Sequence, residues 1–272
     1  MWGMFITANW YFLAIAMGSL AIVAIGYLSK SGWNTVIKRI PEAFTTYIPW
    51  ALLVFGVPYI TYMVLTYFDV IHHNIYHWTH DNLSELIAGK KPYLNIPFFL
   101  VRTIVALGAW GFFAWLIRKD SLREDQEGGL RWFNTAFKHS AIFMVVFAIT
   151  ATMATFDWFM SLEPHWYSTI YGVYGFAGMF ISGWAVTVLA VLALKKRGYL
   201  SEVTEEHYHD LGKFMFAFSI FWTYIWLSQF LLIWYGNLPE EVSYFYVRTQ
   251  GAWAPLFFGN VVLNFAIPFF AL

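Results

Sequence analysis

The sequence has no cysteine, and only 12 % of its 272 residues are charged. Without cysteine, this chain can hold no disulfide, no thiolate-ligated iron–sulfur cluster and no covalently attached c-type haem. Soluble domains carry about 25 % charged residues, so a soluble globular domain is disfavoured. The formal net charge is zero, which gives no indication of a nucleic-acid partner. No basic N-terminal region precedes a small-residue cleavage site, so we expect no signal peptide.

Histidine is scarce inside the apolar runs. A bis-histidine b-type haem needs ligands within membrane spans, and of the 8 His only His139 touches an apolar run, at its edge. We therefore expect no redox cofactor and no catalytic residue in this chain. His73 and His77 would share a helical face at i, i+4, a spacing that can hold a divalent metal, but interfacial helices often carry His without one. We expect no metal here.

Hydrophobic residues make up 60 % of the chain. Apolar runs of about 20 residues recur along it, the length that crosses a bilayer as a helix. We predict an all-α, polytopic transmembrane bundle that forms one integral membrane domain over residues 1–272. The seven predicted spans are 7–28, 49–68, 96–117, 136–156, 168–194, 211–235 and 252–272. The last run reaches Leu272 without a polar cap or basic flank, so we expect a partial chain.

Lys and Arg indicate the orientation of the spans. Of the 16, 12 lie in or beside the connections at 29–48, 118–135 and 195–210, whereas the opposite connections hold 3. The positive-inside rule places the first set in the cytoplasm. The N-terminus and the 157–165 hairpin then face outward. The connection after Arg118, with its dense charge and Gly128-Gly129, is predicted to be a solvated loop.

The stretch from Phe156 to Tyr174 organises the chain. It joins two apolar runs, and it places Asp157, Glu163 and His165 in a short polar hairpin that Pro164 keeps from being helical. Its aromatic residues are of the types that settle at a membrane surface: Trp158, Trp166 and Tyr167. An anchored loop is the simple interpretation; a functional acid at the edge of a span is the alternative.

Arg102 lies six residues into the third predicted span. An intramembrane Arg must either reach the membrane surface with its long side chain or be paired with an acid. The acids on the same side are Asp69, Asp157 and Glu163. We predict a buried ion pair, with Asp157 or Asp69 as the preferred partner.

The fourth span carries a polar stripe. At about 100° per residue, His139, Thr150 and Asp157 project within about 20° of one another over about 27 Å. We predict that the stripe faces the interior of a bundle. A proton path along it could involve Glu163 and His165 at the hairpin and three hydroxyls of the sixth span: Ser219, Thr223 and Tyr224. Alternatively, Thr150 only bonds its own backbone carbonyl and the ends are polar by necessity.

Four motifs resemble one family, the F subunit of bacterial alternative complex III, a quinol:electron-acceptor oxidoreductase. The most specific is FDWFMSLEPHWYST at 156–169, followed by GVY at 172–174; the others are YLNIPFFLVR at 93–102, DVIHHNIYHW at 69–78 and residues 212–241. The family is related to polysulfide-reductase-type membrane subunits. The resemblance implies a multi-pass protein of a bacterial inner membrane, with the N-terminus and the hairpin on the periplasmic side.

The resemblance also implies the function and the partners. We expect a membrane subunit of a quinol:cytochrome c (or other periplasmic acceptor) oxidoreductase that holds no redox centre, supports assembly and takes part in proton translocation. Its expected partners are a homologous quinol-binding membrane subunit, an iron–sulfur subunit and c-type cytochrome subunits, which carry the clusters and haem c. One alternative is a quinol-binding subunit that uses His165 with an acid. The other is a secondary transporter, for which Gly56-Val-Pro58 is the single broken-helix candidate that the sequence offers.

Overall fold

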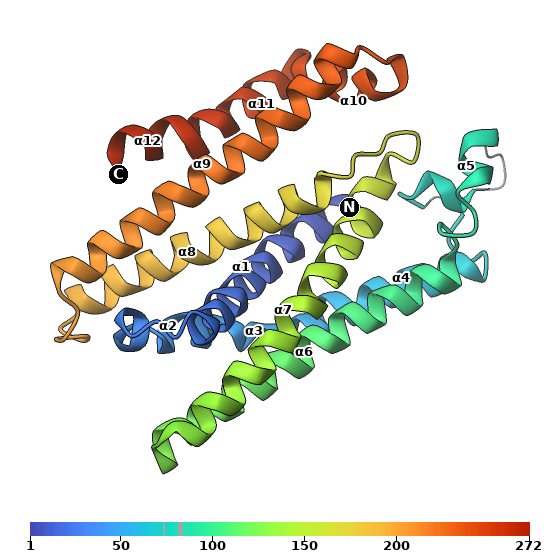
Figure 1. The fold of residues 1–272 in the computed structure, drawn as a ribbon. Coiled ribbons are helices and arrows are strands. Elements are labelled where there is room, and N and C mark those ends of the chain that lie inside the picture. Colours follow the sequence, from blue (N-terminus) through green and yellow to red (C-terminus); the bar gives the residue numbers. More distant parts are fainter. Residues whose placement is uncertain (73, 81–83) are drawn as a thin grey trace.

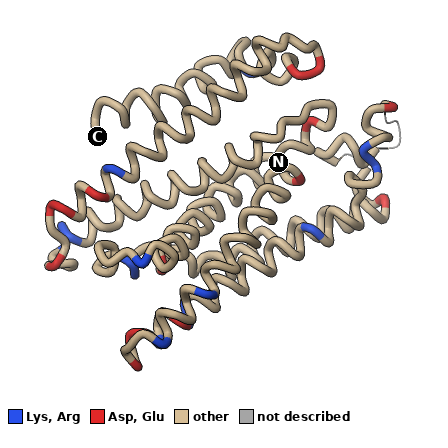
Figure 2. The backbone as a smooth tube through the Cα atoms, viewed as in Figure 1, with Lys and Arg blue, Asp and Glu red and all other residues tan. Residues whose placement is uncertain are grey.

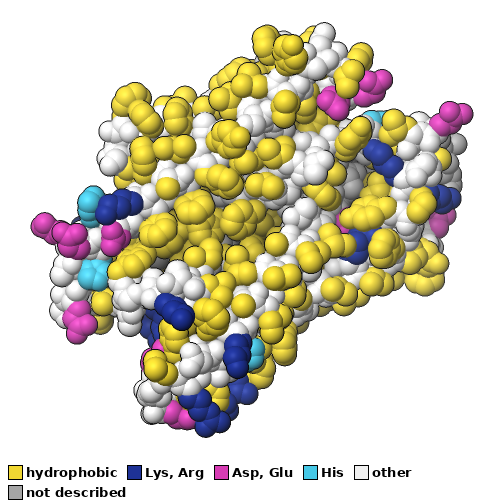
Figure 3. Space-filling view, viewed as in Figure 1, with side chains coloured by type: hydrophobic (Ala, Val, Ile, Leu, Met, Phe, Trp, Pro, Cys, Tyr) yellow, Lys and Arg dark blue, Asp and Glu magenta, His cyan; other side chains and the backbone are white. Residues whose placement is uncertain are grey.

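A computed structural model describes residues 1–72, 74–80 and 84–272. In this part of the chain every regular element is a helix. Seven helices are long and apolar enough to cross a membrane, which confirms the predicted all-α transmembrane bundle. Hydrophobic side chains cover the middle of the face shown in Figure 3, and charged side chains gather toward its ends. This distribution is typical of a multi-pass membrane protein.

Each predicted span corresponds to one observed helix or stack of short helices. The continuous ones are α1 (Trp2–Leu28), α6 (Ile96–Glu127), α7 (Leu130–Trp158), α8 (Tyr171–Lys196) and α9 (Glu205–Gly236). The second span consists of α3 (Tyr47–Ala51), the π-helical turn η2 (Leu52–Gly56) and α4 (Val57–Tyr67), preceded by α2 (Arg39–Thr45). The seventh consists of α11 (Ala254–Val261), the π-helical turn η6 (Val262–Ala266) and α12 (Ile267–Ala271).

Short helices fill the connections. They are η1 (Trp33–Val36), η3 (His77–Thr79), α5 (Glu85–Gly89), η4 (Met160–Leu162), α10 (Pro239–Thr249) and η5 (Gly251–Trp253). The predicted solvated loop after Arg118 is wrong, because α6 continues to Glu127 through residues that favour helix. The helix stops where Gly128 and Gly129 adopt φ of 67° and 72°, which glycine tolerates best.

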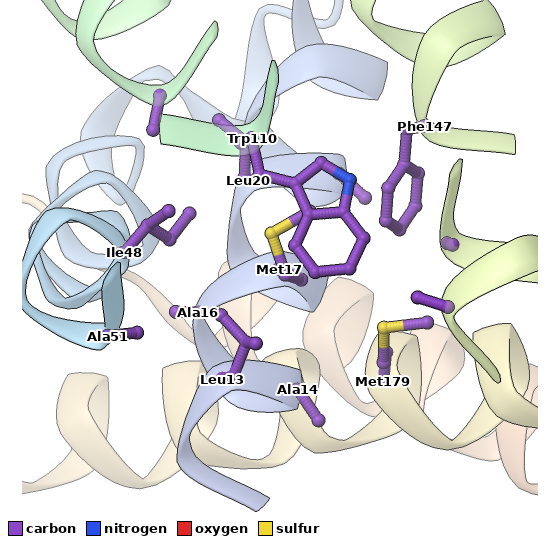
Figure 4. Close-up of a cluster of buried hydrophobic side chains, with 14 of the residues drawn as sticks. Leu13, Ala14, Ala16, Met17, Leu20, Ile48, Ala51, Trp110, Phe147 and Met179 are labelled. Atoms are coloured by element: carbon purple, nitrogen blue, oxygen red, sulfur yellow. The ribbon is translucent and has the colours of Figure 1, made fainter. Parts of the chain in front are cut away.

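α1 lies at the centre of the bundle. Figure 4 shows its Leu13, Met17 and Leu20 among side chains from four other helices, including Trp110 of α6 and Phe147 of α7. The helix can be central because small residues let its neighbours approach closely. At the crossing with α8, a Cβ built on Gly18 would lie 2.0 Å from the carbonyl oxygen of Met179. Only glycine fits at this crossing.

The remaining helices form layers around α1. α6 and α7 run side by side as a long antiparallel pair, and α8 packs on both α1 and α7 (Figure 1). α9 packs on α8, and α11 and α12 pack along α9 (Figure 1). α11, η6 and α12 contain no buried residue. The outer layer is therefore apolar sequence that a bilayer or another membrane protein would surround.

Two ends of the bundle differ in chemistry. Most Lys and Arg lie at the end that holds α2, the α6–α7 turn and the α8–α9 turn, seen at the left and lower left of Figure 2. We call this the basic end. The opposite end, called here the hairpin end, holds the connection between α4 and α6 and the hairpin between α7 and α8 (Figure 1).

Candidate functional site

Arg102 and Asp157 form a buried ion pair at the hairpin end. The guanidinium donates twice to the carboxylate, from Nε to Oδ2 at 2.7 Å and from Nη2 to Oδ1 at 3.0 Å. The two side chains are only 4 % and 2 % exposed. A bidentate Arg–carboxylate pair is among the strongest polar contacts, because both bonds are charge-assisted and the geometry is planar. The pair joins α6 to the last turn of α7.

Aromatic rings complete the surroundings of Arg102. Its Nη1 donates to the backbone oxygen of Tyr93 at 3.1 Å, and its Cζ lies 3.9 Å from the Tyr93 ring centroid and 4.2 Å from that of Phe98. Burial raises the pKa of Tyr93 to about 12, and the Asp157 charge adds to this rise. The Tyr93 hydroxyl therefore stays protonated at neutral pH and remains available as a donor.

The other two candidate partners of Arg102 lie elsewhere. Asp69, named together with Asp157 as preferred partner, has a side chain that is 86 % exposed and accepts a 3.1 Å contact from His72. Asp69 is therefore not the partner, because its residue follows the end of α4 with φ of 56° and turns outward. Glu163 is exposed on the hairpin.

The hairpin is bound tightly to the rest of the molecule. Lys90 donates from Nζ to the backbone oxygen of Pro164 at 2.7 Å, and Tyr76 donates from its hydroxyl to the backbone oxygen of Trp158 at 3.0 Å. Trp166 stacks on Tyr244 of α10 with 3.9 Å between ring centroids. The connection between α7 and α8, residues 159–170, is thus fixed from the α4–α6 connection and from α10.

Two of the aromatic residues assigned to the membrane surface are instead buried in protein. Trp158 is 0 % exposed and donates to the Thr103 hydroxyl at 3.2 Å, and Trp166 is 4 % exposed. Only Tyr167, 58 % exposed, has the accessibility of an interfacial anchor. Composition alone cannot separate these cases, because Trp suits both a membrane surface and a buried site with one hydrogen-bond partner.

A cavity of about 310 Å³ opens beside the hairpin. Its walls are mostly apolar, with Met160, Pro164 and Trp166 on the hairpin side and Lys90 and Tyr93 on the other. Desolvation lowers the pKa of Lys90. The acid–histidine pair that a quinol site would need is not assembled here, because Glu163 and His165 are exposed and do not line this cavity.

The polar stripe of α7 lies against α6. Beyond the Arg102–Asp157 pair, Thr150 accepts a hydrogen bond from Trp110 Nε1 at 2.8 Å, and His139 Nδ1 lies 2.5 Å from Asp120 Oδ2. Thr150 also donates to its own backbone at Val146, as the simpler account expects. Asp157 and Thr150 are buried, and His139 is 27 % exposed. The stripe faces the bundle. We call the three contacts Arg102–Asp157, Trp110–Thr150 and Asp120–His139 the α6–α7 seam.

The seam contains members that sequence reasoning missed. Asp120 and Trp110 were not candidates, yet each bonds a predicted stripe residue. A signal existed for Asp120: it lies 18 residues after Arg102, as Asp157 lies 18 after His139. Eighteen residues are five helical turns, so each helix presents its two ionisable groups on one face.

The hydroxyls of the sixth span do not reach this seam. α9 packs on α8, which separates it from α7 (Figure 1). Ser219 is buried, Thr223 donates to the Ser219 backbone oxygen at 2.8 Å, and Tyr224 is 63 % exposed. A proton path from Asp157 to these hydroxyls would have to pass α8, which packs between α7 and α9, and the extension stays a prediction.

The prediction that His73 and His77 share a helical face cannot be followed to His73, but the described residues 74–76 are not helical. His73 lies outside the described residues, and His77 is exposed in the short helix η3. The described part of this connection contains two short helices, η3 and α5, and α5 ends at Gly89. Among residues 1–72, 74–80 and 84–272, no group of three or more His, Asp or Glu is placed to hold a metal.

The broken-helix candidate has a counterpart that the sequence analysis overlooked. A π-helical turn precedes Pro58 in the second span, and a second one precedes Pro268 in the seventh. The local sequences are LLVFGVP at 52–58 and VLNFAIP at 262–268. Proline lacks the N–H that an α-helix needs and crowds the preceding turn, so a wider turn relieves both helices. The two stacks run in opposite directions (Figure 1).

Comparison of the sequence with protein-family models gives no match, and comparison with curated proteins gives none either. The resemblance to the alternative complex III subunit therefore rests on the four motifs alone. In the structure, residues of three of these motifs meet at the hairpin end: Trp158 with Tyr76, and Asp157 with Arg102.

Proposed function

We propose that this chain is a membrane subunit of a respiratory quinol-oxidising complex, that it holds no redox centre of its own, and that its main role is structural. The Arg102–Asp157 pair is the observation that carries this proposal. Residues of the YLNIPFFLVR motif and the FDWFMSLEPHWYST motif meet in that pair, and both side chains are used in helix–helix bonding. Motif residues that fix a hairpin suit a subunit whose task is to present that hairpin.

The exposed side of the hairpin supports a docking role. Glu163, His165 and Tyr167 are exposed, while Pro164 and Trp166 are buried. Such a surface is polar at the edge and rigid underneath, which favours binding of a partner at the membrane surface. We propose that the partners are the iron–sulfur and c-type cytochrome subunits of the same complex, on the periplasmic side of a bacterial inner membrane.

Affinity purification from native membranes tests this function. A tag on this chain, in mild detergent, should recover polypeptides with a c-type haem Soret band, iron–sulfur signals and quinol oxidation. Arg102→Met should reduce recovery of the haem and iron–sulfur polypeptides, whereas Asp69→Asn, at an exposed site, should not. Recovery of the chain alone from membranes that contain quinol-oxidising complexes would refute the proposal.

A secondary transporter is the second candidate, and the pair of π-helical turns favours it. Transporters are often built from repeats of opposite topology, with broken helices near the membrane midplane. The turns before Pro58 and Pro268 supply such a pair. A purified chain that moves a solute across proteoliposomes without any haem protein would support transport over the respiratory role.

A further inference from the structure

A groove at the basic end has the chemistry of a phospholipid site. It lies between the α2–α3 corner and the last turns of α6, and its volume is about 650 Å³. Its walls include Trp50 and Trp115 together with Arg118, Lys119 and Arg123. The groove therefore combines indole rings, which favour the membrane interface, with three cations.

The cations are segregated on one face of α6. At about 100° per residue, Arg118, Lys119 and Arg123 fall within an arc of about 140°. The acids of the same turns fall outside that arc, and each has a partner on another element. Asp120 bonds His139, Glu124 bonds Lys38 at 3.0 Å, and Asp125 bonds Arg39. Asp120, Glu124 and Asp125 are thus each paired with a residue outside α6, which leaves the groove face positive.

The groove cations form no salt bridge with the described Asp and Glu residues. Within the described part of the chain, none of the three lies within 4.0 Å of an Asp or Glu oxygen. Lys119 Nζ lies 4.6 Å from the Trp115 ring centroid, and Arg123 Cζ lies 4.5 Å from that of Trp132. These stacks hold the two cations in place without cancelling their charge.

Apolar side chains continue from the groove toward the middle of the bundle. Trp50 is 64 % exposed, Leu53 59 % and Phe112 54 %. Such a surface is suited to acyl chains, because it lies along the membrane-spanning part of α3, η2 and α6. Positive charge at the membrane surface above an apolar track matches a molecule with an anionic head and two hydrocarbon chains.

We propose that this groove binds an anionic phospholipid, with its phosphate among Arg118, Lys119 and Arg123 and its acyl chains along Trp50 and Leu53. Basic pockets between transmembrane helices on the positive side of a membrane bind anionic lipid heads by this chemistry. The proposal does not depend on the respiratory role, since it rests only on the groove and its charges.

Native mass spectrometry of the delipidated full chain tests the proposal. The chain is incubated in detergent with equal amounts of phosphatidylglycerol and phosphatidylcholine that have the same acyl chains, so retention reports the head group. The wild type should retain phosphatidylglycerol preferentially. The triple variant Arg118→Gln/Lys119→Gln/Arg123→Gln should lose about fivefold in affinity for each charge, on the order of 100-fold in total.

A matched control removes three exposed cations at the same end but outside the groove: Lys138→Gln/Lys196→Gln/Arg197→Gln. This variant should keep the wild-type preference. Equal preference in the groove variant and the wild type would overturn the proposal, and so would equal loss in both triple variants, which would mean only general attraction. Displacement of the lipid by millimolar inorganic phosphate would also overturn it, because the site would then recognise free phosphate.

A measurement on the wild type alone covers the case in which the groove variant does not fold. Preference for phosphatidylglycerol should weaken as sodium chloride rises, because the cations are partly exposed to screening. Preference that is independent of salt, or retention of both lipids in equal amounts, would contradict the proposed phosphate contact.

Discussion

Removing one member of the Arg102–Asp157 pair should destabilise the bundle strongly. Arg102→Met leaves the Asp157 carboxylate buried, with its side chain 2 % exposed and without its two charge-assisted bonds. Loss of one partner from a buried pair costs about 3–5 kcal/mol. Arg102 also stacks on Tyr93 and Phe98, and loss of those contacts adds about 1–2 kcal/mol.

Removing both members should cost much less than removing them one at a time. In Arg102→Met/Asp157→Leu no charge remains buried, and apolar replacement of a buried pair is often near neutral. A double-mutant cycle should therefore give a coupling free energy of about 2 kcal/mol or more, well above the roughly 0.6 kcal/mol average of polar contacts between membrane helices.

The assay is reversible unfolding of the purified chain in mixed detergent micelles, followed by tryptophan fluorescence. The free energy of unfolding is measured for the wild type, Arg102→Met, Asp157→Leu and the double variant. Asp69→Asn is the control, because its exposed side chain should change stability by less than about 0.5 kcal/mol. Single variants that each cost under 1 kcal/mol, or costs that simply add in the double variant, would refute the buried-pair reasoning.

Three further predictions concern the packing of α1 and the α6–α7 seam. Gly18→Ala should destabilise the chain by about 1–3 kcal/mol in the same unfolding assay, because the added methyl would meet the Met179 carbonyl. Gly178→Ala is the control and should be close to neutral, because a Cβ built on Gly178 has no neighbouring atom within 4 Å. Thr150→Val should cost about 1 kcal/mol or less, measured by the same unfolding curves, since only one interhelical hydrogen bond is lost. In vesicles containing the assembled complex, His139→Ala should leave the ratio of protons moved to quinol oxidised unchanged; a lower ratio would support a proton path instead of a structural seam.

The lengths of the hydrophobic runs predicted the seven spans well, because whether a segment can cross a membrane depends on its own length and composition and not on its partners. The ends of the helices were less predictable. α6 extends ten residues beyond Ile117, since a helix leaves the membrane without changing its backbone and ends only where Gly128 requires it. A hydropathy boundary marks where lipid would end, and a helix boundary marks where the backbone hydrogen bonds end.

For a side chain that bonds a residue on another helix, the sequence could narrow the bonding partner only to a few candidates. The sequence placed Arg102 on the same side as three acids, but the rotation of α6 about its axis decides which one it meets. The counterpart of Gly56-Val-Pro58 was missed for a different reason. Ala266 stands at the position that corresponds to Gly56, although Pro268 and Phe265 repeat the pattern of Pro58 and Phe55.

The aromatic residues between the polar contacts of the seam bear on its role. The Phe113 and Phe143 rings lie 5.7 Å apart, and Phe143 stacks on Phe147 at 5.3 Å, all between the His139 and Thr150 levels. A proton moving along the seam would have to pass these three phenylalanine rings, which themselves carry no hydrogen-bonding group.

The spacing of the polar contacts suits the fixing of register. The Arg102–Asp157 pair lies near one end of the two helices, the His139–Asp120 contact lies toward the other, and Trp110 bonds Thr150 between them. Sliding one helix by a single turn, about 5.4 Å, would break all three contacts together and leave buried charges unpaired. Antiparallel apolar helices otherwise have many registers of similar packing energy, so these contacts select one. That register brings Asp157, and with it the hairpin, to the position where Arg102 and Lys90 hold it.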